Sequence, residues 1–408
     1  MITKFYLSDP AISCSYQYDN GTFIIVDGKI KHIDPRDSPK YTRTQAEGIH
    51  KYYNFTGGGP PTVSIVCPFR HLDLLRDYFL VNISIGDNGR FSTDLCYEHV
   101  DEPISVVVCS QPHFGIKNPK TARFWYGSDP PYKVHSLVDT FILYHTKLMG
   151  AHVVFQSLSD EFSPALEYYR SAGNVFYRFG WTLESLGGFD TDDPEHGFAV
   201  YNYLFQDLAE TTCVWENRFR AKLFAVAYGV DNYAMPLEFG QTLAGIAEKV
   251  NLKEWSAIEV PFVEGSTPKA SLNDQNVLKR WSLLGNINRE VGFTPLGDPR
   301  CASYTLVHTV SGHLPCFRKY ATANESLQHF KFHSVHLLAL ARPRLDTHRG
   351  NGNDWYSELA SRLEVLVQSK RLENIFFVEL HKPNNEKSAS MVERYVSCMF
   401  RELAFDFR

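Results

Sequence analysis

The sequence lacks long apolar runs and a strong charge of either sign. No stretch approaches the ~18 uninterrupted apolar residues of a membrane-spanning helix, and the N-terminus has no charged-then-apolar signal. The 41 basic and 46 acidic residues give a net charge of −5. This balance provides neither a basic field for nucleic acid nor a polybasic block for anionic lipids. We therefore expect no nucleic-acid partner, and membrane attachment only through an anchor outside this chain.

Cysteine-based metal motifs and hydrolase motifs are lacking too. The eight cysteines are scattered, with no CxxC pair and no Cys/His spacing typical of zinc sites. Neither a Gly-x-Ser-x-Gly elbow nor a clear pair of carboxylates is present, which argues against a hydrolase. Internal repeats and low-complexity segments are absent as well, so an ordinary globular chain is expected.

What is present points to the secretory pathway. The cysteine count is even, and four glycosylation sequons occur, at Asn20, Asn54, Asn82 and Asn324. Together they favour a luminal protein with some disulfides. A cytosolic chain with free buried thiols is the alternative, and the sequence does not determine which cysteines pair.

The length and a change of pattern indicate two domains. A chain of 408 residues exceeds the ~250–300 at which one core stops growing. Residues 1–103 are β-rich: a hairpin is predicted over 22–33, around Asp27-Gly28, and further strands at 62–67 and 80–85. We interpret this region as a small sandwich-like accessory module and residues 104–408 as the main domain.

The main domain reads as an α/β fold. Strands and helices alternate from residue 104 on, which predicts a mostly parallel sheet with helices on both faces. Strands are expected at 104–109, 152–156, 174–179, 223–227 and 257–263, with β character at 303–310 and 327–340. Helices are expected at 137–149, 163–173, 197–220, 240–250 and 355–372, and 264–300 reads as a polar region.

One strand leads directly to an acidic residue. The apolar run 223–227 is followed by Gly229-Val230-Asp231. Open α/β sheets bind ligands outside the carboxyl ends of their strands, so Asp231 is a candidate ligand-binding residue. An ordinary Asp-Asn turn is the alternative interpretation.

Several segments between 104 and 340 resemble glycosyltransferase family 92, which includes plant β-1,4-galactan synthases and animal galactosyltransferases. The similar segments are Cys109 with its following loop, 135–145 with the Gly150 turn, 166–175, Cys213, 218–222, Gly229-Val230-Asp231, 311–313 and 328–334. The resemblance implies a GT-A-like, Rossmann-type fold and an Asp-x-Asp motif that holds a divalent metal, Mn²⁺ in most cases. It also implies a nucleotide-sugar donor and a glycan acceptor.

The resemblance places the metal and donor sites as follows. Asp231 occupies the second Asp of the motif, and a later imidazole, His333 or His329, completes the metal site. Donor contacts are expected from Gly229, Asp231 and His313. His313 could instead contact the metal, and a core or hydrogen-bonded histidine is the alternative. An alternative is a site without a tightly held metal, in which Lys222 or Arg218 partly covers the phosphates; a solvated helix end is the other interpretation of these two residues.

Three positions depart from the family pattern. The first Asp of the motif is Gly229, the acid usually following it is Asn232, and the usual Asn-Asp before Cys213 is Thr211-Thr212. Inverting transfer also needs a general base, and Glu264 and Asp274 are the candidates, with surface-loop charges as the alternative. Trp181, Trp215 and Trp281 are candidates for sugar stacking or for core packing.

The sequence therefore favours a luminal Golgi or secretory glycosyltransferase of the inverting type, with UDP-galactose as the expected donor and a polysaccharide or glycoprotein glycan as acceptor. The alternative is a catalytically inactive relative that binds glycans or assists a partner, which the three departures favour. A homodimer is left open, and so is sugar binding by the β-rich module.

Overall fold

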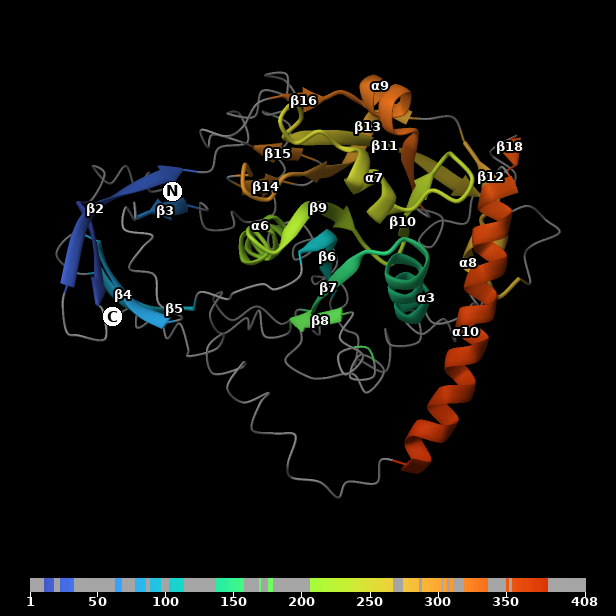
Figure 1. Cartoon of the computed structure of the whole chain (residues 1–408), viewed down its shortest axis with the longest axis horizontal. Coiled ribbons are helices and arrows are strands. Elements are labelled where there is room, and N and C mark those ends of the chain that lie inside the picture. The colour runs from blue at the N-terminus through green and yellow to red at the C-terminus, as the bar shows by residue number, and fades with distance from the viewer. Residues whose placement is uncertain are drawn as a thin grey trace, which may run out of the picture. The chain divides into compact units, whose positions relative to one another are not determined.

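The computed structural model describes a large part of the chain. The described residues are 11–17, 23–32, 63–67, 78–85, 89–96, 103–113, 137–157, 169, 175–178, 206–266, 274–285, 288–302, 304–306, 309–311, 319–336, 350–351 and 354–380. The chain divides into two compact units, the first containing β1 to β5 and the second containing the elements from β6 to α10 (Figure 1). None of the helices in these ranges is long and apolar enough to cross a bilayer.

The first unit is one antiparallel sheet with the strand order β3-β2-β1-β4-β5. A disulfide joins Cys14 to Cys67, and its small core contains Ile12, Tyr16 and Val81. The described residues of this unit form a single sheet, so they do not show the two packed sheets of the predicted sandwich. Its strands are β1 Ile12–Gln17, β2 Phe23–His32, β3 Val63–Val66, β4 Tyr78–Ile85 and β5 Gly89–Cys96.

The predicted hairpin around Asp27-Gly28 is wrong, because β2 runs straight through it. Its first half pairs with β1, up to Ile12 opposite Gly28, and its second half pairs with β3, from Lys29 opposite Val66. A side chain at Gly28 would collide with Ile12 and Cys14. The close approach of β1 accounts for the glycine at position 28. The sequence had suggested a turn at this position.

The second unit is built on a mixed sheet, where a mostly parallel one was predicted. Its main strand order is β10-β17-β11-β13-β9-β6-β7-β8. The pairs β9–β6, β6–β7, β7–β8 and β11–β17 are parallel, whereas β13 is antiparallel to both β9 and β11, and β10 to β17. The strands are β6 Ile104–His113, β7 His152–Ser157, β8 Val175–Arg178, β9 Ala221–Tyr228, β10 Asn232–Pro236, β11 Ala257–Ser266, β13 Asn288–Gly297 and β17 Phe332–His336.

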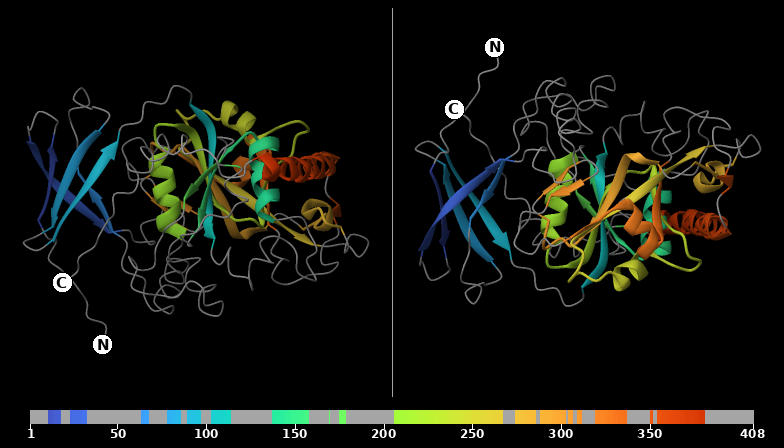
Figure 2. Two further views of the ribbon diagram at one scale, coloured as in Figure 1. Left: turned by 90° about the horizontal axis from the view of Figure 1, so that it is seen from below. Right: turned by 90° about the horizontal axis from the view of Figure 1, so that it is seen from above.

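Short strands and helices complete this unit. Figure 2 shows α6 against one face of the sheet and α3 against the other. The short strands are β12 Leu283–Leu284, β14 Tyr304–Leu306, β15 Thr309–Ser311, β16 Tyr320–Ala321 and β18 Gly350–Asn351. The helices are α3 Leu137–Leu143, η3 Tyr144–Leu148, α6 Gln206–Glu216, α7 Leu243–Lys249, α8 Val277–Arg280, α9 Ala323–Glu325, η6 Ser326–Phe330 and α10 Asp354–Leu380.

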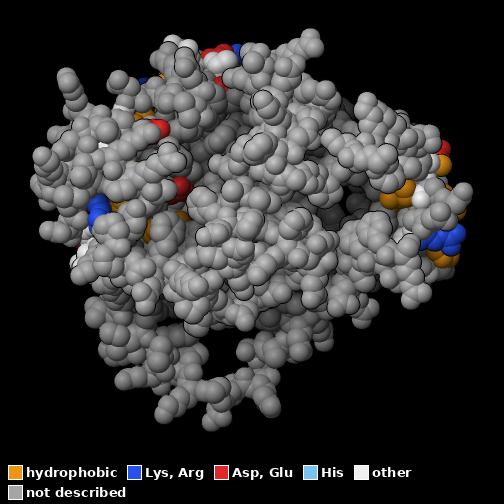
Figure 3. Space-filling model, turned by 180° about the vertical axis from the view of Figure 1, so that it is seen from behind, with side chains coloured by type: hydrophobic (Ala, Val, Ile, Leu, Met, Phe, Trp, Pro, Cys, Tyr) orange, Lys and Arg blue, Asp and Glu red, His pale blue; other side chains and the backbone are white. Residues whose placement is uncertain are grey.

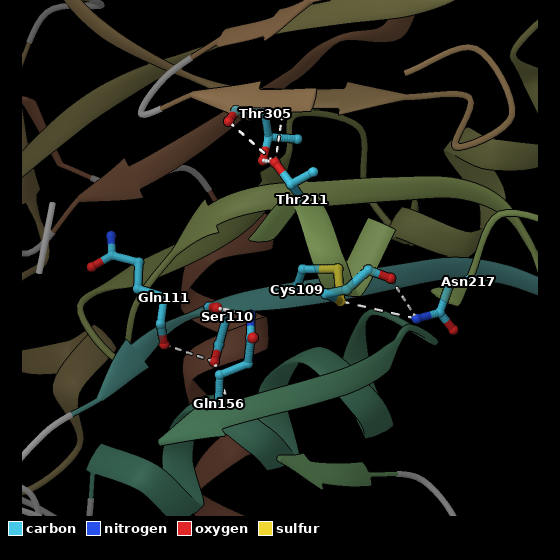
Figure 4. Close-up of a disulfide and its surroundings, with 8 residues drawn as sticks. Cys109, Ser110, Gln111, Gln156, Thr211, Asn217 and Thr305 are labelled. Carbon is cyan, nitrogen blue, oxygen red and sulfur yellow. Dashed lines mark hydrogen bonds between the residues drawn. A yellow bond between two sulfur atoms is a disulfide. The ribbon is translucent and has the colours of Figure 1, made fainter. Parts of the chain in front are cut away.

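The side chains on the two faces of β6 pack into two different cores. Val106 and Val108 pack with Phe141 and other residues of α3 in the larger core, whereas Val107 packs with α6 in the smaller one. This alternation is what a strand buried on both faces requires. The disulfide between Cys109 and Cys213 fastens α6 to β6 within the smaller core (Figure 4).

Most predicted elements of the main domain are confirmed, but β10 and β13 were not predicted, and residues 327–330, expected to have β character, lie in η6. The segment 264–300 was expected to be a polar region, but β13 lies there, between β9 and β11. Thr294, Pro295 and Gly297 interrupt its apolar pattern and hid the strand. Pro295 is tolerated because the pairing of β13 with β9 covers only Leu296 and Gly297. The predicted helix at 163–173 lies outside the described residues, apart from Tyr169.

Candidate functional site

The carboxyl ends of four strands meet at one edge of the sheet. β6 and β9 are parallel neighbours, and β11 and β17 run in the same direction because β13 is antiparallel to its neighbours on both sides. This edge therefore carries Gln111 and His113 from β6, the residues after β9, and Glu264 from β11. Parallel strands in α/β sheets present their ligand sites at this end.

A tight turn places Asp231 at this edge. The Asn232 backbone N–H donates to the Gly229 carbonyl oxygen at 3.0 Å, so the chain turns within four residues between β9 and β10. A Cβ built on Gly229 would lie 2.7 Å from Asp231 Oδ1 and 3.3 Å from Gln111 Oε1. The two side-chain oxygens therefore leave too little space for a side chain at position 229.

Gln111 projects from a bulged end of β6. The β6–β7 register shifts between Cys109 and Pro112, and Gln156 fixes this bulge from β7. Its backbone N–H donates to Ser110 Oγ at 2.9 Å, and its Nε2 donates to the Ser110 carbonyl oxygen at 2.8 Å. Ser110 Oγ donates in turn to the Gln111 carbonyl oxygen at 2.9 Å. Figure 4 shows the Gln111 amide pointing away from this network.

His113 lies at the end of β6, within electrostatic range of Asp231. Its ring stacks on Phe155 with 4.4 Å between centroids, and its Nδ1 lies 3.2 Å from the Gln156 carbonyl oxygen. Burial lowers the pKa of His113 to about 4, against smaller upward effects of the Gln156 carbonyl and the Asp231 charge. The imidazole is therefore neutral at pH 7, within electrostatic range of the carboxylate.

A π-helical turn supports the strand that follows Asp231. Tyr144 Oη donates to the Ala234 carbonyl oxygen at 2.6 Å, and the Ala234 N–H donates to His145 Nε2 at 3.4 Å. His145 Nδ1 lies 2.9 Å from the Phe141 carbonyl oxygen. Two successive side chains of η3 thus hold both backbone groups of Ala234, a use of a π-bulge that is common near functional sites.

The structure does not bring His333 or His329 to Asp231. In the β10–β17 pairing, His333 is opposite Met235, whereas Asn232 is opposite His336. Three residues of strand separate these positions, roughly 10 Å. His333 is 6% exposed, and within the described residues neither ring nitrogen has a hydrogen-bond partner. Burial lowers the pKa of His333 to about 4. His329 is exposed on η6.

The register identifies another histidine position that the sequence pattern missed. The backbone of His336 is opposite Asn232 on one side and opposite Glu264 on the other. It occupies the end of β17, at the edge that carries Asp231. Only the strand register reveals this, because His333 and His336 are close together in a segment rich in histidine.

The two candidate general bases have different settings. Glu264 is half-buried near the end of β11 and lies two strands from Asn232, about 10 Å at the usual strand spacing. Asp274 precedes α8, and its Oδ1 accepts from the Asn276 N–H at 3.4 Å. Asn276 caps α8 by accepting from the Leu278 and Lys279 N–H groups. Asp274 thus belongs to the start of a helix, and Glu264 belongs to the sheet edge.

The expected phosphate-binding cations lie far from Asp231. Lys222 is near the amino end of β9, six residues before Tyr228, which corresponds to roughly 20 Å of strand. It forms an ion pair with Glu248 at 3.6 Å. Arg218 precedes β9 and donates to the Ala302 carbonyl oxygen at 2.9 Å. The length of β9 therefore separates both side chains from the turn that carries Asp231.

The remaining predicted residues divide between core, surface and undescribed parts. Trp281 is buried, which confirms core packing, whereas Trp215 is 40% exposed on α6 beneath Arg218. His313 and Trp181 lie outside the described residues. Thr211, where the family has a polar pair, accepts from the Thr305 N–H at 2.9 Å and so anchors β14 (Figure 4).

The edge offers oxygen ligands for a cation only in part. Asp231 and Gln111 oxygens converge on the space at Gly229, and these are the ligand types that hard divalent cations prefer. Across the described ranges, no group of three or more His, Cys, Asp or Glu side chains is placed to hold a metal. The residues fit a cation that takes its other ligands from a bound molecule or from water.

Comparison with protein-family models finds no match for this chain. Comparison with curated proteins likewise finds no significant match.

Proposed function

We propose that this protein is an inverting glycosyltransferase that transfers a hexose, galactose in view of the family resemblance, from a UDP-sugar to a polysaccharide or glycoprotein glycan. One observation carries the proposal: a carboxylate, Asp231, stands in a tight turn at the carboxyl end of β9, beside the end of the parallel strand β6. The proposed fold is GT-A-like, and the run of parallel strands β8-β7-β6-β9 followed by antiparallel β13 supports it.

Asp231 would help to hold a divalent cation, Mn²⁺ by the resemblance. When bound, such a cation offsets the negative charge that develops on the departing diphosphate. Asp231 supplies the charged ligand, and His113, within electrostatic range of it, stays neutral and adds no competing positive charge. Ser110 and Gln156 hold the end of β6, and Phe155 stacks on the His113 ring.

Glu264 is the proposed general base. It takes the proton from the acceptor hydroxyl as that oxygen bonds to the anomeric carbon, while the bond between that carbon and the diphosphate oxygen breaks. Attack from the side opposite the leaving group inverts the configuration. Glu264 lies at the same end of the sheet as the Asp231 turn, with β17 between β11 and β10.

The first unit is proposed to bind the glycan acceptor. The face of its sheet opposite the core carries Phe23 and Ile25, which are 54% and 70% exposed. Hydrophobic side chains of this unit reach the surface in Figure 3. An exposed aromatic ring suits a sugar, because sugar rings pack on aromatic side chains.

The proposed location is the Golgi lumen. Two described disulfides, Cys14–Cys67 and Cys109–Cys213, and a third that involves Cys301 support an oxidising compartment.

A catalytically inactive glycan-binding relative is the second candidate. Gly229 in place of a carboxylate favours it, as does the distance between His333 and Asp231. Thermal protection of the protein by a panel of nucleotide sugars with Mn²⁺, followed by an assay for UDP release in the presence of glycans, separates the two. An enzyme shows protection and UDP release. The inactive relative shows no release with any donor.

A further inference from the structure

We infer that Gln111 supplies the oxygen ligand that is missing at position 229, so that Gln111 and Asp231 together hold the cation and, through it, the donor diphosphate. The inference rests on the proposed function and assigns a residue from a different strand to its metal site. It also implies that the cation and the diphosphate bind together, each weakly without the other.

The geometry around Gly229 carries this inference. Gln111 Oε1 and Asp231 Oδ1 lie 3.3 Å and 2.7 Å from the point where a Cβ of residue 229 would stand. One oxygen comes from the end of β6 and the other from the β9–β10 turn. Two oxygens from separate strands thus face one small space that the absence of a side chain leaves open.

The Gln111 side chain has a setting that suits a ligand. It is half-buried, and within the described part of the chain its amide makes no hydrogen bond, while its backbone carbonyl is occupied by Ser110 Oγ. The network of Ser110 and Gln156 fixes the backbone from which it projects. The amide is therefore positioned by its strand and uncommitted at its tip.

Charge explains why the two ligands would need the donor. Replacing a carboxylate by an amide removes one negative charge from the site while keeping an oxygen. Mg²⁺-like cations are commonly bound by one or two carboxylates together with substrate phosphates. With one carboxylate and one amide, the diphosphate must contribute most of the charge that retains the cation.

Gly229 and Gln111 also constrain each other. A carboxylate side chain at position 229 would need a Cβ closer to Asp231 Oδ1 than real Cβ atoms come, and in contact with the Gln111 amide. In this arrangement the space accommodates either a side chain on residue 229 or the Gln111–Asp231 pair, but not both. The glycine at position 229, which departs from the family motif, is thus what allows the Gln111 side chain to occupy this space.

The test measures Mn²⁺ binding by the loss of the free-ion paramagnetic resonance signal, with and without UDP, on the full chain. Gln111→Met keeps the length of the side chain and removes the oxygen, and Gln111→Glu restores a carboxylate. Gln328→Met, at an exposed position on η6, is the matched control. Thermal midpoints of all variants establish that they are folded.

We expect the unmodified protein to bind Mn²⁺ far more tightly with UDP than without. Gln111→Met should lower the Mn²⁺ affinity measured with UDP by about 10- to 100-fold, the range found when groups that support a metal site are lost. Gln111→Glu should raise the affinity measured without UDP, because it returns the missing charge. Gln328→Met should match the unmodified protein.

Three results overturn the inference. If Gln111→Met binds like the unmodified protein while Asp231→Ala does not bind, the inference fails and the proposed function stands. If Gln111→Glu weakens binding as much as Gln111→Met, the amide donates to phosphate and is not a cation ligand. If the unmodified protein shows no Mn²⁺-dependent UDP binding, the proposed function fails, and the inference fails with it.

Discussion

The Tyr144 hydroxyl donates a 2.6 Å hydrogen bond to the carbonyl oxygen of Ala234, three residues after Asp231. Tyr144 is fully buried, and its neighbour His145 accepts from the N–H of the same Ala234. The π-helical turn η3 therefore holds the strand that follows the Asp231 turn, although 89 residues of sequence separate His145 from Ala234.

Tyr144→Phe is expected to destabilise the larger unit and to loosen the Asp231 turn. It leaves the buried Ala234 carbonyl without this donor, which costs about 1–3 kcal/mol. Differential scanning calorimetry measures the stability, and calorimetric titration with UDP and Mn²⁺ measures the site. Tyr356→Phe is the control, because its hydroxyl donates to the Leu278 and Trp281 carbonyl oxygens, which lie at α8 and its end. Equal UDP affinities of the two variants would refute a positioning role for Tyr144.

Gly229→Ala is expected to abolish metal-dependent UDP binding and to leave the fold nearly unchanged. The new Cβ would stand 2.7 Å from Asp231 Oδ1, and a carboxylate at the tip of a side chain can move aside at little cost. Gly245→Ala in α7 is the control, because its Cβ meets only Thr242 Oγ1 at 3.4 Å. A Gly229→Ala protein that binds UDP and Mn²⁺ normally would show that the space at Gly229 is unimportant.

The two described disulfides should stabilise different units. Cys109–Cys213 closes 104 residues and Cys14–Cys67 closes 53. Loss of either is expected to cost about 2–5 kcal/mol, since the crosslink restricts the unfolded chain. In calorimetry, the Cys109→Ala/Cys213→Ala variant should melt earlier in the larger unit alone. The Cys14→Ala/Cys67→Ala variant should affect the smaller unit alone. A single transition that shifts equally in both variants would contradict this.

Acid should destabilise the larger unit through His333. Burial lowers the pKa of His333 in the folded chain to about 4 from 6.5. Between these values the unfolded chain binds a proton that the folded chain does not, so stability is lost as pH falls from 6.5 to about 4. The slope is about 1.4 kcal/mol per pH unit. His333→Leu should reduce this slope in denaturation curves at pH 7 and pH 5, whereas His329→Leu at an exposed position should not. An unchanged slope in His333→Leu would show that the ring is not a buried neutral group.

Much of the fold could be predicted from the sequence, because its elements carry local signals. The apolar run of β9 and the glycine that ends the helix at Gly150 can be recognised in the sequence. The structure confirms the second signal, because Gly150 has a φ of 67°. β13 was missed because Thr294 and Pro295 break its pattern, and its burial comes from neighbours far away in sequence. The β2 strand was mistaken for a hairpin because Asp-Gly normally marks a turn.

The site could be predicted only where a residue directly follows a strand. Asp231 satisfies this, whereas Gln111 and His113 enter the site through a β6 bulge that the sequence does not announce. His336 was not considered, because spacing along the chain does not give the register of an antiparallel pair. Lys222 and Arg218 were considered for the phosphates, but the length of β9 separates them from the turn after it.

Calorimetric titration with UDP, in the presence and absence of Mn²⁺, tests most directly the claim that the turn after β9 binds a nucleoside diphosphate. We predict binding by the unmodified protein with Mn²⁺, little without it, and none for Asp231→Ala at an unchanged thermal midpoint. Equal binding by Asp231→Ala, or no binding by the unmodified protein at any Mn²⁺ concentration, would contradict the claim.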